Sequence, residues 1–160
     1  MAGEGPPPSI KIGPWGGNRG TVFDVTNPPT CLNNMTIRAG SYIDSIGFSY
    51  IDEASQKRTT GPFGGTYGQL TTIQFAPSEY VKNISRTIGL RPFSSGRRTI
   101  VTSLEIETNV KKYGPYGKAH QDSSFSIPLQ EGVSVMGFFG RAGDLIDAIG
   151  VYIGYNIGEA

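Results

Sequence analysis

Hydrophobic residues alternate with polar or small residues along much of the chain, which is the pattern of a β-strand with one buried face. The alternation is clearest at Ile46, Phe48 and Tyr50. The same pattern recurs in four further segments, with Gly or Pro between them: residues 80–88, 104–110, 133–138 and 146–153. No window has the period of an amphipathic helix. We therefore expect an all-β chain with on the order of a dozen short strands, arranged as a sandwich, a barrel or a prism.

One turn motif occurs three times and divides the chain into three units. The copies begin at Gly13, Gly61 and Gly114, and each reads Gly-Pro-aromatic-Gly. The units are each about fifty residues long, enough for about four strands, which cannot bury their inner face alone. Three units that share one core predict a three-sheet prism with pseudo-threefold symmetry, whereas three blades are too few for a propeller.

A second motif, Gly-x-x-x-Asp at the start of a strand, occurs in only two of the units. It runs from Gly40 to Asp44 and from Gly143 to Asp147. In the remaining unit the matching positions hold Arg98 and Thr102, which supply neither the glycine nor the carboxylate. The chain is thus predicted to have three structural units, two of which carry a full set of polar groups.

Composition narrows the class of protein. A net charge of +1, without a block of like charges, provides no basic surface for nucleic acid or for an anionic membrane. The single cysteine, Cys31, cannot form an internal disulfide, and one histidine cannot support a zinc cluster. The first residues lack the apolar core of a signal peptide, and no stretch is long and apolar enough to span a membrane. We expect no cofactor, no metal and no membrane insertion, and a location in the cytoplasm or nucleus.

Three segments resemble the jacalin-related lectins of plants, in particular their mannose-binding branch. They are the turn at 13–18, the turn at 113–117 and the stretch Gly-Phe-Phe-Gly-Arg-Ala-Gly-Asp-Leu-Ile-Asp-Ala-Ile-Gly-Val-Tyr at 137–152. The resemblance runs from about Ile10 to Ile153, nearly the whole chain. It implies a β-prism of three four-stranded Greek-key sheets. It also implies binding of mannose- or glucose-containing glycans and glycoproteins without a metal, no catalysis, and a homodimer or larger assembly.

The resemblance also sets the domain boundaries. The lectin domain is expected at residues 10–155, between a flexible Gly/Pro-rich segment at 1–9 and a C-terminal tail at 156–160.

The resemblance assigns two sugar sites, each made of one Gly-x-x-x-Asp turn and a glycine from a Gly-rich loop. Sugar hydroxyls both donate and accept hydrogen bonds, so such a site needs a fixed carboxylate acceptor and several fixed N–H donors. Site 1 is predicted at Gly20, Gly143, Asp144, Leu145 and Asp147. Site 2 is predicted at Gly68, Gly40, Ser41, Tyr42 and Asp44. The remaining unit has Gln121 in place of the loop glycine and Thr102 in place of the aspartate, and is predicted not to bind.

Two other functions stay open from the sequence. The first is a protein-interaction module on the same fold with impaired sugar sites. The second is a hydrolase using His120 with Asp122 and Ser123, although no nucleophile elbow accompanies these residues. Arg19 and Tyr67, which replace small residues of the family's loops, are predicted to affect sugar selectivity. The aromatic Trp15 is expected in the core.

Overall fold

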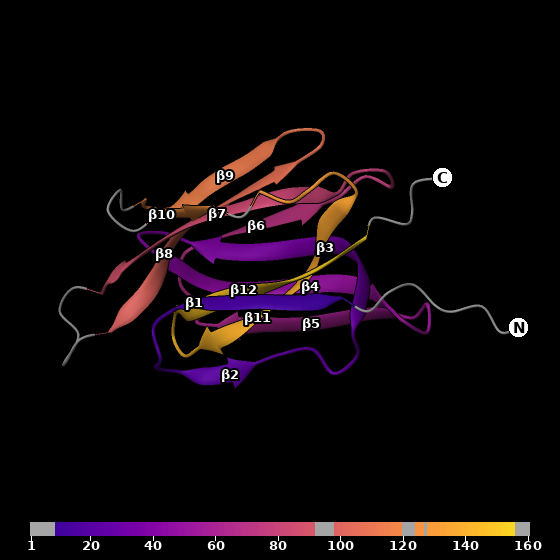
Figure 1. Cartoon of the computed structure of the whole chain (residues 1–160). Helices are drawn as coiled ribbons and strands as arrows, with labels where there is room; N and C mark the ends of the chain where they lie inside the picture. Colours follow the sequence, from indigo (N-terminus) through magenta and orange to yellow (C-terminus); the bar gives the residue numbers. More distant parts are fainter. Residues whose placement is uncertain (1–8, 92–97, 120–123, 127, 156–160) are drawn as a thin grey trace, which may run out of the picture.

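The protein consists of three antiparallel β-sheets around a shared interior (Figure 1). The computed structural model describes residues 9–91, 98–119, 124–126 and 128–155, and these residues form twelve strands and no helix. Residues 1–8 of the predicted N-terminal segment 1–9 and the whole predicted tail 156–160 lie outside the described residues. The all-β prediction and the expected number of strands are confirmed.

Each sheet has a central hairpin flanked by two edge strands that are consecutive in sequence. The first sheet has the order β1 (Ile10–Gly16), β12 (Ile146–Tyr155), β11 (Val133–Ala142) and β2 (Thr21–Phe23). The second has the order β5 (Lys57–Gly64), β4 (Ile43–Asp52), β3 (Pro29–Ala39) and β6 (Gln69–Gln74). The third has the order β10 (Ser124–Ser126), β7 (Val81–Leu90), β8 (Thr99–Thr108) and β9 (Lys112–Gly117). The second and third sheets are Greek keys of four consecutive strands, and the first has the same order with its strands drawn from the two ends of the chain. This arrangement confirms the predicted three-sheet prism.

The repeated Gly-Pro-aromatic turn has the same local structure in all three units. The peptide bonds before Pro14, Pro62 and Pro115 are cis, and the glycine before each proline has a φ of 90° to 99°. Each turn also shifts the register with which β1, β5 or β9 pairs with its central strand. The sequence repeat therefore corresponds to three equivalent edge strands.

The inward faces of the three sheets form one hydrophobic core. Each sheet contributes a fully buried isoleucine: Ile146, Ile37 and Ile106. Aromatic pairs join the first sheet to the second, because Phe138 packs edge-on against Phe48 at 5.3 Å and Phe23 stacks on Phe63 at 4.5 Å. Such pairs contribute about 0.5–1.5 kcal/mol each beyond the burial of their area, so they help to fix how the sheets pack together.

Two expectations were wrong. Val110 was expected on a buried strand face, but β8 ends at Thr108 and Val110 is 64% exposed in the turn that follows. Trp15 was expected in the core, but it is half-buried on the edge strand β1, where its ring packs against the guanidinium of Arg86 at 3.9 Å. Both errors have the same cause, since the hydrophobic pattern does not reveal where a strand ends or which strands form the edges.

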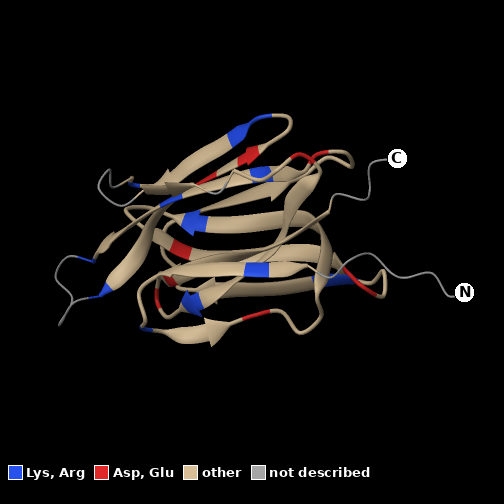
Figure 2. Ribbon diagram, viewed as in Figure 1, with Lys and Arg blue, Asp and Glu red and all other residues tan. Residues whose placement is uncertain are grey.

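Charged residues of both signs are interspersed over the ribbon (Figure 2). The described residues include no helix long and apolar enough to cross a membrane. They also include no group of three or more His, Cys, Asp or Glu side chains that could hold a metal ion.

Candidate functional site

The two Gly-x-x-x-Asp motifs form equivalent tight turns at the ends of central hairpins. Residues 40–42 join β3 to β4, and Gly40 N–H donates to Tyr42 O at 3.1 Å. Residues 143–145 join β11 to β12, and Gly143 N–H donates to Leu145 O at 2.9 Å. The turn residues Gly40, Ser41, Gly143 and Asp144 are exposed, Tyr42 is half-buried, and Leu145 is buried. The backbone of each turn therefore reaches the surface, while the aspartate that follows begins a buried strand.

The Gly-rich loops pack against these turns as predicted. Gly17 N–H donates to the Asp147 carbonyl oxygen at 2.8 Å, and Gly65 N–H donates to the Asp44 carbonyl oxygen at the same distance. A Cβ on Gly20 would lie 2.7 Å from Asp147 Oδ1, and a Cβ on Gly68 would lie 2.6 Å from Asp44 Oδ2. The structure thus brings together the predicted residues of site 1 and those of site 2, and only glycine allows so close an approach.

Two equivalent arginines, Arg141 and Arg38, donate hydrogen bonds to the backbone of the two Gly-rich loops. Arg141 donates to the carbonyl oxygens of Arg19 and Gly20, both at 3.1 Å, and Arg38 donates to the carbonyl oxygen of Gly68 at 3.3 Å. Each arginine stands two residues before the glycine of its turn, in the repeated sequence Arg-Ala-Gly. These two arginines were not among the predicted site residues, although the repeated Arg-Ala-Gly sequence could have identified them.

The unit of the third sheet, which has no predicted sugar site, makes the same backbone contact between loop and strand but carries different side chains. Lys118 N–H donates to the Thr102 carbonyl oxygen at 2.9 Å, as Gly17 and Gly65 do at the two aspartates. Thr102 is fully buried, and its hydroxyl pairs with that of Thr87 at 2.7 Å. Thr102 thus stands where the other two units have an aspartate, while most of this turn (residues 92–97) and Gln121 lie outside the described residues.

At site 1 the carboxylate of Asp147 is already paired. Arg98 Nε donates to Oδ2 at 2.8 Å and Nη2 donates to Oδ1 at 2.9 Å, so the guanidinium binds both oxygens of Asp147. Arg98 Nη1 also donates to Asp144 Oδ1 at 2.5 Å, and Arg91 Nη1 donates to Asp144 Oδ2 at 2.8 Å. The Asp147 side chain has no exposed surface, whereas that of Asp144 is 55% exposed.

These ion pairs stabilise the charged forms of the groups involved. The hydrogen bond to Asp147 is the main reason that the pKa of Arg98 is raised above its ordinary value. Arg98, and after it Arg91, hold the pKa of Asp144 below that of an ordinary aspartate. Arg98 and Asp144 are therefore both charged at neutral pH.

At site 2 most of Asp44 is buried, but its carboxylate has no partner among the described residues. Asp44 is 6% exposed, and it forms no ion pair and accepts no hydrogen bond among the described residues. Burial raises the pKa of Asp44, with a smaller contribution from Asp144, while Arg91 and Arg38 oppose the rise. The neighbouring Tyr67 is 80% exposed beside Gly68. Site 2 thus combines a carboxylate without a partner, a glycine loop and an exposed aromatic ring.

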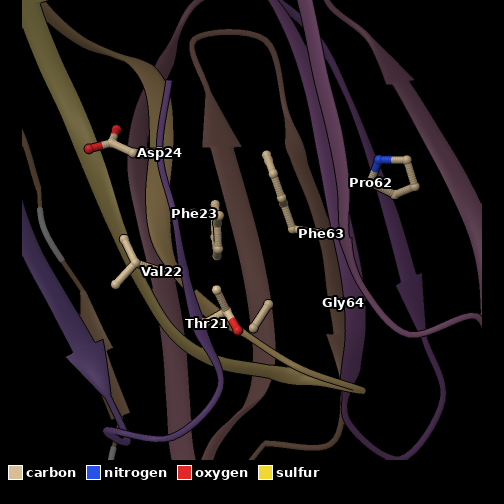
Figure 3. A pocket seen from close by; sticks show the side chains of 8 residues that line it. Thr21, Val22, Phe23, Asp24, Pro62, Phe63 and Gly64 are labelled. Atoms are coloured by element: carbon tan, nitrogen blue, oxygen red, sulfur yellow. The ribbon is translucent and has the colours of Figure 1, made fainter. Parts of the chain in front are cut away.

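A cleft of about 400 Å³ lies between the edge strands β2 and β5 (Figure 3). The stacked rings of Phe23 and Phe63 form part of its lining. The lining residues are Thr21, Val22, Phe23, Asp24, Pro62, Phe63, Gly64 and Ala142. Thr21 follows Gly20 of site 1 directly, and Gly64 immediately precedes the loop that ends at Gly68 of site 2. The cleft is therefore distinct from both predicted sites but adjoins the loops of each. The residues considered for hydrolysis, His120, Asp122 and Ser123, lie outside the described residues.

Comparisons with known proteins agree with this geometry. The model of the Jacalin-like lectin domain matches residues 12–152. The chain is 40% identical over 145 residues to Horcolin of Hordeum vulgare, an alignment that covers 90% of this chain and 96% of that protein. It is 42% identical over 153 residues to the Mannose/glucose-specific lectin of Parkia platycephala, which covers 91% of this chain and 32% of the longer relative.

Two solved structures have the same fold. A mannose binding jacalin related lectin from Ananas comosus superimposes with a TM-score of 0.84 at 35% identity, covering 92% of this chain and 98% of that one. A mannose-specific jacalin-related lectin from Morus nigra, solved with mannose, has a TM-score of 0.79 at 27% identity, covering 96% and 99%.

Proposed function

The chain belongs to the jacalin-like lectin family, and we propose that it binds mannose- or glucose-type glycans without a metal ion at site 2 and site 1. As a member of this family it is a carbohydrate-binding protein and not an enzyme. The choice of sugar is supported by the mannose/glucose specificity in the name of the Parkia relative and by the mannose-binding lectins of the same fold. The alternative of a protein-interaction module is not favoured.

The observation that carries the proposal is the unpaired carboxylate of Asp44 beside an exposed turn. A carboxylate without a protein partner keeps its acceptor capacity for a ligand, and two sugar hydroxyls could donate to its two oxygens. The N–H groups of Ser41, Tyr42 and Gly68 would donate to sugar oxygens, and backbone donors need no side-chain ordering on binding. Site 1 has the same backbone, but its carboxylate is held by Arg98.

A shallow site of this kind binds a single sugar weakly. Four or five hydrogen bonds at roughly 1 kcal/mol each, less the cost of immobilising the ligand, correspond to a Kd of about 1 mM. A second site and a homodimer or larger assembly would raise avidity for a branched glycan by about 10² to 10⁴. Multivalent mannan should therefore compete better than methyl α-mannoside at equal mannose concentration. The oligomeric state and the location in the cytoplasm or nucleus stay predictions.

Calorimetric titration with methyl α-mannoside tests the proposal. Asp44→Asn should weaken binding by about 10- to 100-fold, because a charged acceptor is lost. Glu53→Gln is the matched control, since it removes one exposed carboxylate from the turn at the opposite end of β4 and should leave the affinity unchanged. Failure of the wild-type chain to bind mannoside or mannan would overturn the proposed function.

A further inference from the structure

Arg98 reaches from the third sheet into site 1, which belongs to the first. It stands four residues before Thr102, as Gly40 and Gly143 stand four residues before their aspartates. The Gly17 loop packs on the start of β8, where a Cβ on Gly17 would lie 2.1 Å from the Thr99 carbonyl oxygen. This packing places the turn that carries Arg98 beside Asp147.

The equivalent neighbour of site 2 has no side chain. The Gly65 loop packs in the same way against the 143–145 turn, where a Cβ on Gly65 would lie 2.3 Å from the Asp144 carbonyl oxygen. The position that corresponds to Arg98 beside site 2 is therefore Gly143. The two sites share one backbone plan, and the neighbouring residue at this position is an arginine at site 1 and a glycine at site 2.

The guanidinium of Arg98 binds the two carboxylate oxygens of Asp147 that a sugar would bind. Two of its N–H groups bind the two oxygens of Asp147 side by side, as a pair of vicinal hydroxyls would. Arg98 Nη2 also lies against the site 1 turn, 3.3 Å from where a Cβ on Gly143 would be. Since the Asp147 side chain has no exposed surface, a hydroxyl can reach it only if Arg98 moves.

Arg98 would keep a partner after moving. Its Nη1 is paired with Asp144, whose side chain is 55% exposed and can follow the arginine towards solvent. When a sugar displaces Arg98, hydrogen bonds from sugar hydroxyls replace the two charge-assisted hydrogen bonds from Arg98 to Asp147. Arg98 remains paired with Asp144, so no charge is left isolated. Losing one such bond corresponds to about a 10- to 100-fold change in affinity. No such exchange is needed at Asp44.

We propose that Arg98 determines the selectivity of the two sites by acting as an internal competitor for Asp147, so that neutral hexoses bind at site 2 first. This inference rests on the proposed function and concerns how the same sugar is divided between its two sites. We expect site 1 to bind methyl α-mannoside about 10- to 100-fold more weakly than site 2 in the wild-type chain. Arg98 is thus a specificity-determining residue that need not contact the bound sugar.

The test is a titration of the full chain with methyl α-mannoside, followed by two-dimensional amide NMR. Amides of residues 143–147 report site 1, and those of residues 40–44 report site 2. Arg98→Gly restores the residue found in the other two units and should bring the Kd of site 1 to that of site 2. Lys57→Ala is the control, because it removes an exposed positive charge at the end of β5 far from both sites and should leave the ratio of the two Kd values unchanged.

The possible outcomes separate the inference from the proposed function. Equal saturation of both sites in the wild-type chain, or an unchanged ratio of the two Kd values in Arg98→Gly, would make Arg98 a purely structural ion pair. Arg98→Lys keeps the charge but loses the paired N–H geometry, and it should give an intermediate ratio even if Arg98→Gly folds poorly. If methyl α-mannoside changed the amide chemical shifts of site 2 alone in every variant, the proposed role of Arg98 would be overturned but the proposed lectin function would stand. The absence of shifts at either site would overturn both.

Discussion

Substitution of Gly68 by alanine should disable site 2 through a single methyl group. Gly68 has a φ of 84°, and its Cβ would lie 2.6 Å from Asp44 Oδ2 and 2.8 Å from the Ala39 carbonyl carbon. The Ala39 atom belongs to the backbone of β3 and cannot turn away as a flexible side chain would. The loop must therefore shift, which moves the Gly68 N–H and fills the space beside the carboxylate.

Gly132 provides a matched control for the backbone strain. Its φ is 85°, but a Cβ there would meet no atom within 4 Å. A left-handed alanine costs about 1–2 kcal/mol, so Gly132→Ala should lower the Tm by about 2–8 °C. Gly68→Ala carries the same strain and a steric overlap of about 1–3 kcal/mol, and it should lower the Tm by about twice as much.

Thermal unfolding followed by circular dichroism gives the stability of both variants, and calorimetry gives their affinity for methyl α-mannoside. We expect Gly132→Ala to bind as the wild-type chain does and Gly68→Ala to lose at least about tenfold in affinity at site 2. If Gly68→Ala bound mannoside with unchanged affinity, the sugar would not lie where Gly68 meets Asp44. If both variants melted together, the close approach would not constrain the loop.

Three further predictions concern acid, stability and metals. Mannoside affinity at site 2 should fall on acidification at a higher pH than for an ordinary aspartate, because burial raises the pKa of Asp44; calorimetry at several pH values measures this. Glu79→Gln should destabilise the fold by about 1–3 kcal/mol at neutral pH. Although burial opposes ionisation, hydrogen bonds from Ala76, Thr108 and Tyr113 lower the pKa of Glu79. The stability that it contributes is present above the pKa of the unfolded state and is lost as pH falls through the folded pKa, so melting curves of the two proteins should converge in acid. Excess EDTA should leave mannoside binding unchanged, and a loss restored by calcium would contradict the proposed donors.

Much of the fold could be predicted because the three units repeat both their turns and their hydrophobic alternation. The glycines of the repeated turns mark places where a side chain would collide with backbone, so their positions revealed equivalent edge strands. The same logic paired Gly20 with Asp147 and Gly68 with Asp44, and the structure places both pairs in contact. Repetition is thus a reliable guide to the backbone of each site.

The state of each carboxylate could not be predicted from a single unit. Arg98 stands where the other two units have a glycine, in the unit that lacks a sugar site. Its side chain binds Asp147, which belongs to the neighbouring sheet and lies 49 residues further along the chain. The pattern within a unit predicts which groups a turn presents, but not which side chain reaches it from the next sheet. For this reason the sequence predicts two equivalent sites, while the structure pairs the carboxylate of site 1 with Arg98 and leaves that of site 2 without a partner among the described residues.

The first sheet has a further consequence, because it joins the beginning of the chain to its end. Ile10 pairs with Ile153, so β1 and β12 bring residues close to the two termini side by side (Figure 1). Site 2 is complete within residues 40–68, whereas site 1 combines Gly20 with residues 143–147 and can form only after the last sheet closes. During synthesis the residues of site 2 are therefore all made before those of site 1 are complete. A circular permutant could link the termini and open the turn at residues 53–56. In this permutant the residues of site 1 would lie close together in the sequence. Those of site 2 would come from opposite ends of the new chain, as would β4 and β5.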